Sequence, residues 1–221
     1  MTTPVTHTNS PMHALVAAAR FNFRTVLFNP FILGFSVLLP IFMYLMFGAS
    51  IPEGHHWIGN GNISARVLAT MAAYGVVGAL SAIGVTVALE RQSGWLRQIA
   101  LTQIGVGRYL VAKLLAGVCA SIIIVAVCYG VGAATGARMT GPTWLLTAAA
   151  AILGSLIAMA MGLAAAFAVK SDSAFALTSG VLVLSAFMSG MFLPLHMLPD
   201  FFQQLAPYTP LYGLAQLVVA P

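Results

Sequence analysis

Charged side chains are scarce in this 221-residue sequence: Asp, Glu, Lys and Arg together make up 6% of it, and hydrophobic residues make up 60%. Soluble domains carry about 25% charged residues, so the composition excludes an ordinary water-soluble domain. The sequence also lacks a cluster of Lys or Arg with interleaved aromatic residues. Its net charge of +5 is therefore too thinly spread for a nucleic-acid surface, and we expect no nucleic-acid partner.

Groups that could carry chemistry are equally scarce. The four acidic residues are widely spaced, so no carboxylate set can hold Mg²⁺. The adjacent His55 and His56 lack a third ligand, and we expect no metal site. Cys119 and Cys128 fall half a turn apart on one helix, which excludes a disulfide between them. No G-x-x-x-x-G-K-[ST] phosphate loop is present, so we expect no catalytic residue and no cofactor bound by this chain.

Long apolar runs dominate what is present. A helix of about 20 residues crosses the hydrocarbon core, and in lipid each backbone group must be paired within such a helix. The sequence predicts five spans, at residues 30–48, 67–89, 114–137, 139–169 and 173–193. Pro40 predicts a kink in the first, and the second can begin as early as Ile63. Small residues at four-residue spacing in the fourth permit close helix packing: Gly154, Ala158 and Gly162.

A shorter amphipathic helix is predicted over residues 10–29. Ser10 and Pro11 suit its N-cap and first helical position. Its apolar face and its flanking cations include Phe23, Arg20 and Arg24. This pattern is typical of a helix that lies in the membrane interface, the alternative being a ragged beginning of the first span. Asn29 and Pro30 then disfavour continued helix, so the chain can turn into the bilayer there.

The basic residues predict the orientation. With the amino terminus in the cytoplasm, seven of the nine basic residues fall in cytoplasmic segments: Arg20, Arg24, Arg91, Arg97, Arg108, Lys113 and Lys170. The outer segments then hold only Arg66 and Arg138. Because basic residues concentrate in cytoplasmic loops, we expect a cytoplasmic amino terminus, and we expect the chain after residue 194 to lie outside.

Two segments interrupt the apolar pattern. Residues 90–115, ERQSGWLRQIALTQIGVGRYLVAKLL, are a polar insert between the second and third spans. Residues 194–217 are apolar but contain four prolines: Pro194, Pro199, Pro207 and Pro210. One straight helix cannot contain them. We expect short helices that dip into the outer leaflet and return, the alternative being a loosely ordered external loop.

Both segments resemble parts of a known family. Glu90-Arg91 after an apolar run, then Gly94, Leu96 and the sequence Gly107–Arg108–Tyr109, resembles the permease subunits of type-2 ABC transporters. The tail SGMFLPLHMLPDFFQQLAPYTPL, with Asp200 among its prolines, resembles the outer re-entrant hairpin of the same family. The sequence departs from the family at Trp95, where a small or hydroxyl residue is usual, and near Gln103, where proline is usual. The family has a sixth span, which we expect beyond the end of this chain.

The resemblance implies an all-α integral membrane protein with a single permease domain over residues 1–221. It further implies a bacterial plasma-membrane exporter in which two permease chains, identical or related, pair with two nucleotide-binding ATPase subunits that hold ATP and Mg. A coupling helix at 90–104, within the region 90–109, would then seat in the ATPase. Its apolar anchors would be Trp95, Leu96 and Ile99, and its polar rim Glu90, Arg91 and Arg97, with Gly94 between them.

The cargo is less defined. The spans carry no charged residue away from their ends, which argues against a carrier driven by protons or sodium and favours a hydrophobic or amphipathic small molecule. Candidates to line its path are Tyr74, Phe187, Met188, Met191 and Phe192. Each could instead simply pack helix on helix. The alternative function is a non-transporting membrane scaffold or sensor that docks a cytoplasmic partner through the region 90–109. Membrane lipid is an expected partner in either case.

Overall fold

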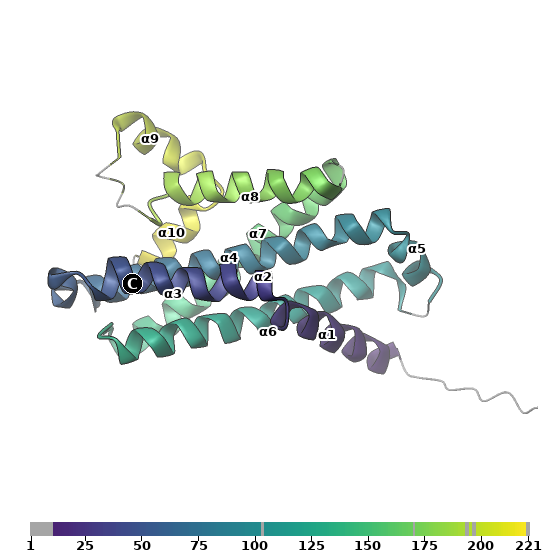
Figure 1. Cartoon of the computed structure of the whole chain (residues 1–221), viewed down its shortest axis with the longest axis horizontal. Helices are drawn as coiled ribbons and strands as arrows, with labels where there is room; N and C mark the ends of the chain where they lie inside the picture. The colour runs from purple at the N-terminus through teal and green to yellow at the C-terminus, as the bar shows by residue number, and fades with distance from the viewer. Residues whose placement is uncertain (1–10, 103, 170, 193–194, 196–197, 220–221) are drawn as a thin grey trace, which may run out of the picture.

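The structure is a computed structural model that describes residues 11–102, 104–169, 171–192, 195 and 198–219 (Figure 1). Its helices are α1 Pro11–Leu27, α2 Pro30–Leu33, α3 Leu39–Tyr44, α4 Ile63–Gln92, α5 Trp95–Ala100, α6 Gly105–Ala134, α7 Gly141–Ala168, α8 Ser171–Met188, α9 Asp200–Leu205 and α10 Tyr212–Val219. Short π and 3₁₀ segments join them, namely η1 Gly34–Leu38, η2 Leu45–Ala49, η3 Pro52–His55 and η5 Ala206–Tyr208. The expected all-α membrane fold is confirmed, and a two-stranded hairpin of β1 Trp57–Ile58 and β2 Gly61–Asn62 adds to it.

The helices gather around α4. In Figure 1, α4 runs along the long axis of the molecule, and it packs against α6, α7, α8 and the segment η1. Among the described residues, α4, α6 and α7 are long and apolar enough to cross a membrane, and Gly34–Ala49 and Ser173–Met188 are shorter apolar stretches. All five predicted runs are therefore helical, and three of them have the full length of a span.

Glycines set the closest helix contacts. A Cβ atom at Gly162 of α7 would collide with the backbone oxygen of Ser81 on α4, and one at Gly84 would meet the backbone oxygen of Met159. The backbones of α4 and α7 can therefore approach closely, as small residues allow in membrane helices. Gly154 of α7 lies under Leu214 of α10 in the same way. The predicted small-residue stripe thus serves two separate interfaces.

The first apolar segment is interrupted where the sequence predicts it. α1 ends at Leu27, and the Oδ1 atom of Asn29 accepts a hydrogen bond from the backbone N–H of Ile32 at 3.3 Å to begin the next helix. Pro40 has no N–H to donate to the carbonyl of Ser36, and the helix widens into the π segment η1 just before it. That carbonyl lies against Gly75, where an added Cβ would collide with it.

Several helix ends differ from the ends of the predicted spans. The fifth run was predicted to reach residue 193, but α8 ends at Met188 because Gly190 adopts a positive φ of 80°. The backbone N–H of Met191 then donates to the carbonyl of Ala186 at 3.1 Å, and that of Gly190 to Phe187 at 3.3 Å, as in a Schellman cap. Conversely, α6 begins at Gly105, nine residues before the predicted 114. Apolar runs mark the lipid contact, whereas caps mark the helix ends.

The end of the bundle opposite α5 is held by two buried polar side chains. The Oδ1 atom of Asn62 accepts hydrogen bonds from the N–H groups of Ala65 and Arg138, at 2.9 and 3.0 Å, and its Nδ2 donates to the carbonyl of Gly136 at 2.9 Å. Tyr44 is fully buried, with its hydroxyl 2.9 Å from Thr135 Oγ1. Together they join the first span, α4 and α6.

The proline-rich tail forms the predicted short helices. Pro199 stands at the N-cap of α9, Pro207 lies in η5, and Pro210 precedes α10. Asp200 begins α9 and is exposed. The last helix of this tail, α10, buries Leu214, Ala215 and Val218 against α7 and α4 and so forms part of the bundle. Pro194 lies outside the described residues.

The amino-terminal helix α1 packs along α6 at the α5 end of the molecule (Figure 1). Asn22 and Val26 are buried, and Phe23 packs against the main hydrophobic cluster. Arg20 and Arg24 are exposed, as is expected for the polar edge of an interfacial helix. The predicted N-cap, Ser10, lies outside the described residues.

Candidate functional site

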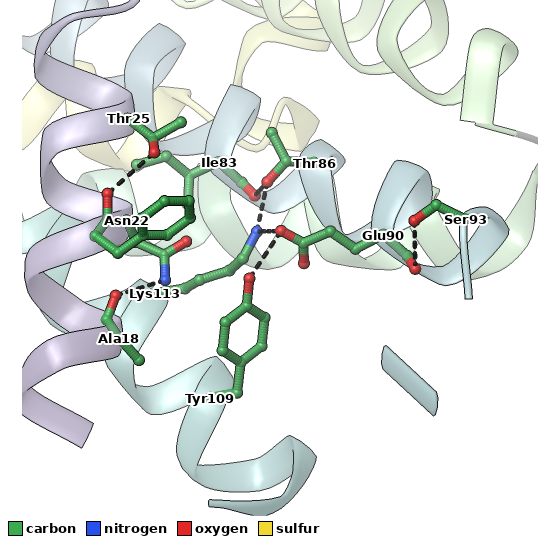
Figure 2. Close-up of polar contacts among 10 residues, drawn as sticks. Ala18, Asn22, Thr25, Ile83, Thr86, Glu90, Ser93, Tyr109 and Lys113 are labelled. Atoms are coloured by element: carbon green, nitrogen blue, oxygen red, sulfur yellow. Dashed lines mark hydrogen bonds and ion pairs between the residues drawn. The ribbon is translucent and has the colours of Figure 1, made fainter. Parts of the chain in front are cut away.

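The described part of the chain contains one salt bridge, and it is buried where α4 and α6 approach α5. The Nζ atom of Lys113 lies 2.7 Å from Oε1 of Glu90 (Figure 2). The whole Lys113 residue is 1% exposed, and the Glu90 side chain is 21% exposed. A lysine this deeply buried is uncommon in a folded protein unless it is paired, so this pair marks the site.

Two further side chains complete the network. Lys113 donates to Oγ1 of Thr86 at 2.7 Å, and the hydroxyl of Tyr109 donates to Oε1 of Glu90 at 2.9 Å (Figure 2). The hydroxyl of Thr86 in turn donates a hydrogen bond to the carbonyl of Ile83 at 2.7 Å. Thr86 and Glu90 are four residues apart on α4, and so are Tyr109 and Lys113 on α6. Each pair therefore occupies one helix face, and the two faces meet.

The energetics make this network hard to break. Burying an ion costs several kcal/mol, which only a well-placed partner and further hydrogen bonds offset. Lys113 has both, and its Nζ also lies 5.6 Å from the centre of the Tyr109 ring. The second carboxylate oxygen of Glu90, Oε2, is buried and has no hydrogen-bond partner among the described residues. The pair therefore stabilises the contact only while both charges are present.

Two more elements lie beside this network. The side chains of Asn22 on α1 and Trp95 on α5 lie near that of Tyr109. Asn22 is buried and donates its side-chain amide to the carbonyl of Ala18 at 2.8 Å (Figure 2). Four elements, α1, α4, α5 and α6, thus meet at one tyrosine. A displacement of α5 would have to move this junction or break it.

The turn between α4 and α5 depends on Gly94. Its φ of 76° is left-handed, a conformation that glycine adopts without cost. The N–H of Gly94 donates to the carbonyl of Arg91 at 3.3 Å to close α4, and its own carbonyl accepts from Arg97 at 3.0 Å to open α5. Gly94 therefore ends one helix and begins the next.

This geometry corrects the predicted single helix at 90–104. Glu90 through Gln92 belong to α4, and α5 contains only Trp95–Ala100. Gln103, where the sequence departs from the family, lies outside the described residues, as does the cationic Lys170.

The predicted contact residues divide into inward and outward groups. Glu90 was predicted at an exposed rim, but its carboxylate faces Lys113 inside the protein. Ile99 was predicted as an anchor for a partner, but it is buried, and Leu96 packs against an inner cluster around Val85. These three placements share one cause: a short helix on a bundle packs its inner face against its own chain.

The outward group consists of Trp95, Arg97 and Arg91, all exposed. The guanidinium of Arg91 lies 5.5 Å from the centre of the Phe167 ring on α7. Sequence reasoning missed Leu101, which follows α5 directly and is 90% exposed. The only sequence feature that could have identified Leu101 as a contact residue is that it is apolar and lies in an otherwise polar loop. Trp95 and Leu101 together give this end of the molecule an exposed apolar surface.

The cargo-path candidates lie elsewhere, and three of them come together. The Tyr74 and Phe192 rings meet edge to face at 4.8 Å, and the Phe187 and Phe192 rings stack at 4.7 Å. Met191 is 2% exposed, and Met188 is half-buried. The described residues include no group of three or more His, Cys, Asp or Glu side chains that could hold a metal ion.

Comparisons with known proteins agree with this architecture. A family model described as "ABC-2 type transporter" matches residues 13–220. The chain is also similar to "Putative transport permease YvfS" of Bacillus subtilis (strain 168). The two are 24% identical over 207 residues, which cover 91% of this chain and 82% of that protein.

Proposed function

Because this chain belongs to the ABC-2 type transporter family and is a multi-pass permease subunit, we propose that it exports a lipophilic compound using work delivered through α5. The observation that carries this proposal is the buried Glu90–Lys113 pair with Tyr109, which joins α4 to α6 at the place where α5 and α1 pack against them.

The network suits the transmission of force. Removing one partner of a buried ion pair by mutation destabilises a protein by about 3–5 kcal/mol, because the other charge is left without its partner. The two charges therefore favour staying together when α4 and α6 move. A push on α5 is therefore passed to α4 and α6 together, and through the packing of α1 along α6 to α1. These helices tilt as a unit, and the cleft between two permease chains changes from inward-open to outward-open. The proline-rich tail gates release on the far side.

The partner docks on the exposed residues beside this junction. Trp95 and Leu101 supply the apolar contact, and Arg97 and Arg91 supply charge at its edge. Two ATPase subunits on the cytoplasmic side bind ATP and Mg, and a second permease chain completes the complex. The positive-inside bias supports this orientation, with the amino terminus in the cytoplasm of a bacterial cell.

The cargo is a hydrophobic or amphipathic molecule. The apolar helices offer it dispersion contacts, and the aromatic cluster of Tyr74, Phe187 and Phe192 offers ring faces and edges. Without an intramembrane carboxylate in the predicted spans, the energy source is the ATPase and not an ion gradient.

The docking surface can be tested by co-purification. The chain is expressed with the ATPase subunits of its own bacterium and reconstituted into liposomes. The double substitution Trp95→Ala and Leu101→Ala should reduce the ATPase recovered with the permease at least tenfold. Leu145→Ala is the matched control, since Leu145 is also an exposed leucine (76%) but lies on α7. Equal recovery from both variants would contradict the assigned surface.

The same preparation separates transport from scaffolding. A transporter moves a lipophilic dye across the liposome membrane only with ATP. A scaffold or sensor would retain the ATPase and move no dye, which would overturn the export proposal while leaving the docking surface in place.

A further inference from the structure

A cleft lies within the single chain, away from the α5 junction. The first apolar segment, α4 and α8 form its walls, and its volume is about 260 Å³. Its lining is mainly apolar and includes Phe35, Tyr74, Val77, Phe175, Leu182 and Val183. For comparison, a dry engineered cavity of about 150 Å³ binds benzene. The cleft is therefore large enough for one small lipophilic molecule.

The cleft exists because α4 presents small residues at its floor. Gly78 and Ala82 lie one helical turn apart in the lining. A Cβ atom at Gly78 would meet only Ser36 Oγ, at 3.8 Å, so ordinary space lies above it. Elsewhere on α4, at Gly75 and Gly84, a neighbouring backbone fills that space. The hollow at Gly78 and Ala82 is therefore local.

The wall of this cleft carries an unpartnered hydrogen-bonding group. Thr178 of α8 lines the cleft and is 4% exposed, and its Oγ1 is buried with no partner among the described residues. Threonine in a helix commonly donates to the carbonyl three or four residues back. Thr70, Thr86 and Thr147 do so here. Thr178 does not, and a buried hydroxyl without a partner costs free energy that a bound acceptor would recover.

The rim of the cleft is apolar and accessible. Phe35, Phe175 and Val183 are 57%, 43% and 40% exposed, and they belong to the apolar stretches Gly34–Ala49 and Ser173–Met188, which the sequence predicts to lie in the bilayer. A ligand would therefore enter from the apolar phase, which selects lipophilic molecules over polar metabolites.

We propose that this cleft binds one lipophilic molecule that carries a single hydrogen-bond acceptor, such as an ester or ketone carbonyl, with the Thr178 hydroxyl as the donor. That chemistry has two sources, the ester of a membrane lipid or the transported compound. The binding site itself does not depend on the proposed export, whereas the identification of its ligand as cargo rests on that proposal.

Benzophenone is a suitable probe, since it has two apolar rings, one ketone and the ability to cross-link on illumination. The full chain in lipid nanodiscs is illuminated with it, and mass spectrometry locates the adducts. We expect adducts on cleft residues. Ala82→Leu, which fills the floor, should reduce them at least fivefold, whereas Ala149→Leu on the exposed face of α7 should not. Adducts elsewhere only, or equal labelling of both variants, would overturn the proposal.

The hydrogen bond is tested by a pair of ligands and an isosteric substitution. Diphenylmethane has the shape of benzophenone without the ketone and serves as a competitor. One neutral hydrogen bond should make benzophenone bind about fivefold more tightly than diphenylmethane. Thr178→Val should abolish that preference while leaving the affinity for diphenylmethane unchanged. A preference that persists in the Thr178→Val variant would overturn the role of Thr178.

Two further arms identify the source. If a lipid ester occupies the cleft, nanodiscs of ether-linked phospholipid should show stronger labelling than ester-linked ones. If cargo occupies it, labelling in the complex with the ATPase should fall on addition of ATP. Either result supports the site. If cleft labelling disappears whenever two permease chains pair, with or without ATP, the cleft is filled by the second chain and the proposal fails.

Discussion

At the scale of single residues, the structure gives Glu90 and Lys113 a role that their sequence positions conceal. From the sequence, Glu90 is predicted to contact the ATPase at the rim of the coupling helix, and Lys113 is one of the basic residues that predict the orientation in the membrane. Their four-residue spacing to Thr86 and Tyr109 does predict a polar face on each helix. Pairing those faces, however, requires the relative position of α4 and α6, which depends on the glycine contacts among α4, α6 and α7. The pairing of Glu90 with Lys113 therefore depends on the tertiary packing of the helices and could not be predicted from the local sequence pattern.

The ion pair predicts a characteristic non-additivity. Glu90→Gln alone should destabilise the protein by about 3–5 kcal/mol, because it leaves a buried ammonium without its counter-charge. Combining Glu90→Gln with Lys113→Met should recover most of that loss, since neither charge then remains. Thermal unfolding of the purified variants in detergent measures both. A double variant whose loss equals the sum of the two single losses would show that the pair is not coupled.

At the scale of elements, the sequence predicted that helices exist better than where they end. Each apolar run became a helix, but α8 ends at Met188, just before the left-handed Gly190, and α5 is shorter than the polar insert suggested. Left-handed glycines set such ends, and a glycine in the sequence does not reveal whether its φ is positive. The sequence likewise could not show which face of α5 is exposed, because that depends on the helices that bury Ile99.

The turn at Gly94 can be tested against a matched glycine. Gly94→Ala should cost about 1–2 kcal/mol, because a left-handed φ strains any residue with a Cβ, although no atom lies within 4 Å of the added group. The strain should change the direction of α5. The ATPase subunits should then hydrolyse ATP more slowly in complex with this variant than with the wild-type permease. Gly107→Ala on α6 is the control: it is also open but has no positive φ. Equal effects on ATPase stimulation would argue against the turn.

The contact between α4 and α7 makes a second prediction at this scale. Gly162→Val should destabilise the fold by about 3 kcal/mol or more, because the valine side chain would collide with the backbone of α4 at Ser81. The yield of monodisperse protein and its melting temperature measure the loss. Gly180→Ala on α8, with open space above it, should keep both near the wild-type values. A normal yield of the Gly162→Val variant would contradict the close approach.

At the scale of the whole molecule, composition and the apolar runs predicted a helical membrane body, and the family match confirms a permease subunit. The orientation stays a prediction. In sealed inside-out vesicles, with both native cysteines replaced, a cysteine at Leu101 should react with an impermeant thiol reagent. A cysteine at Ile58, in the hairpin at the opposite end, should stay protected. The reverse pattern would invert the topology and place α5 beyond the reach of a cytoplasmic ATPase.

The central claim is that work enters at α5 and passes through the Glu90–Lys113 junction. The most direct measurement is the number of cargo molecules moved per ATP hydrolysed, in liposomes that contain the complete complex with the double substitution Glu90→Gln and Lys113→Met. The account predicts continued ATP hydrolysis with the transport ratio reduced at least tenfold. A ratio equal to that of the wild-type complex would contradict it.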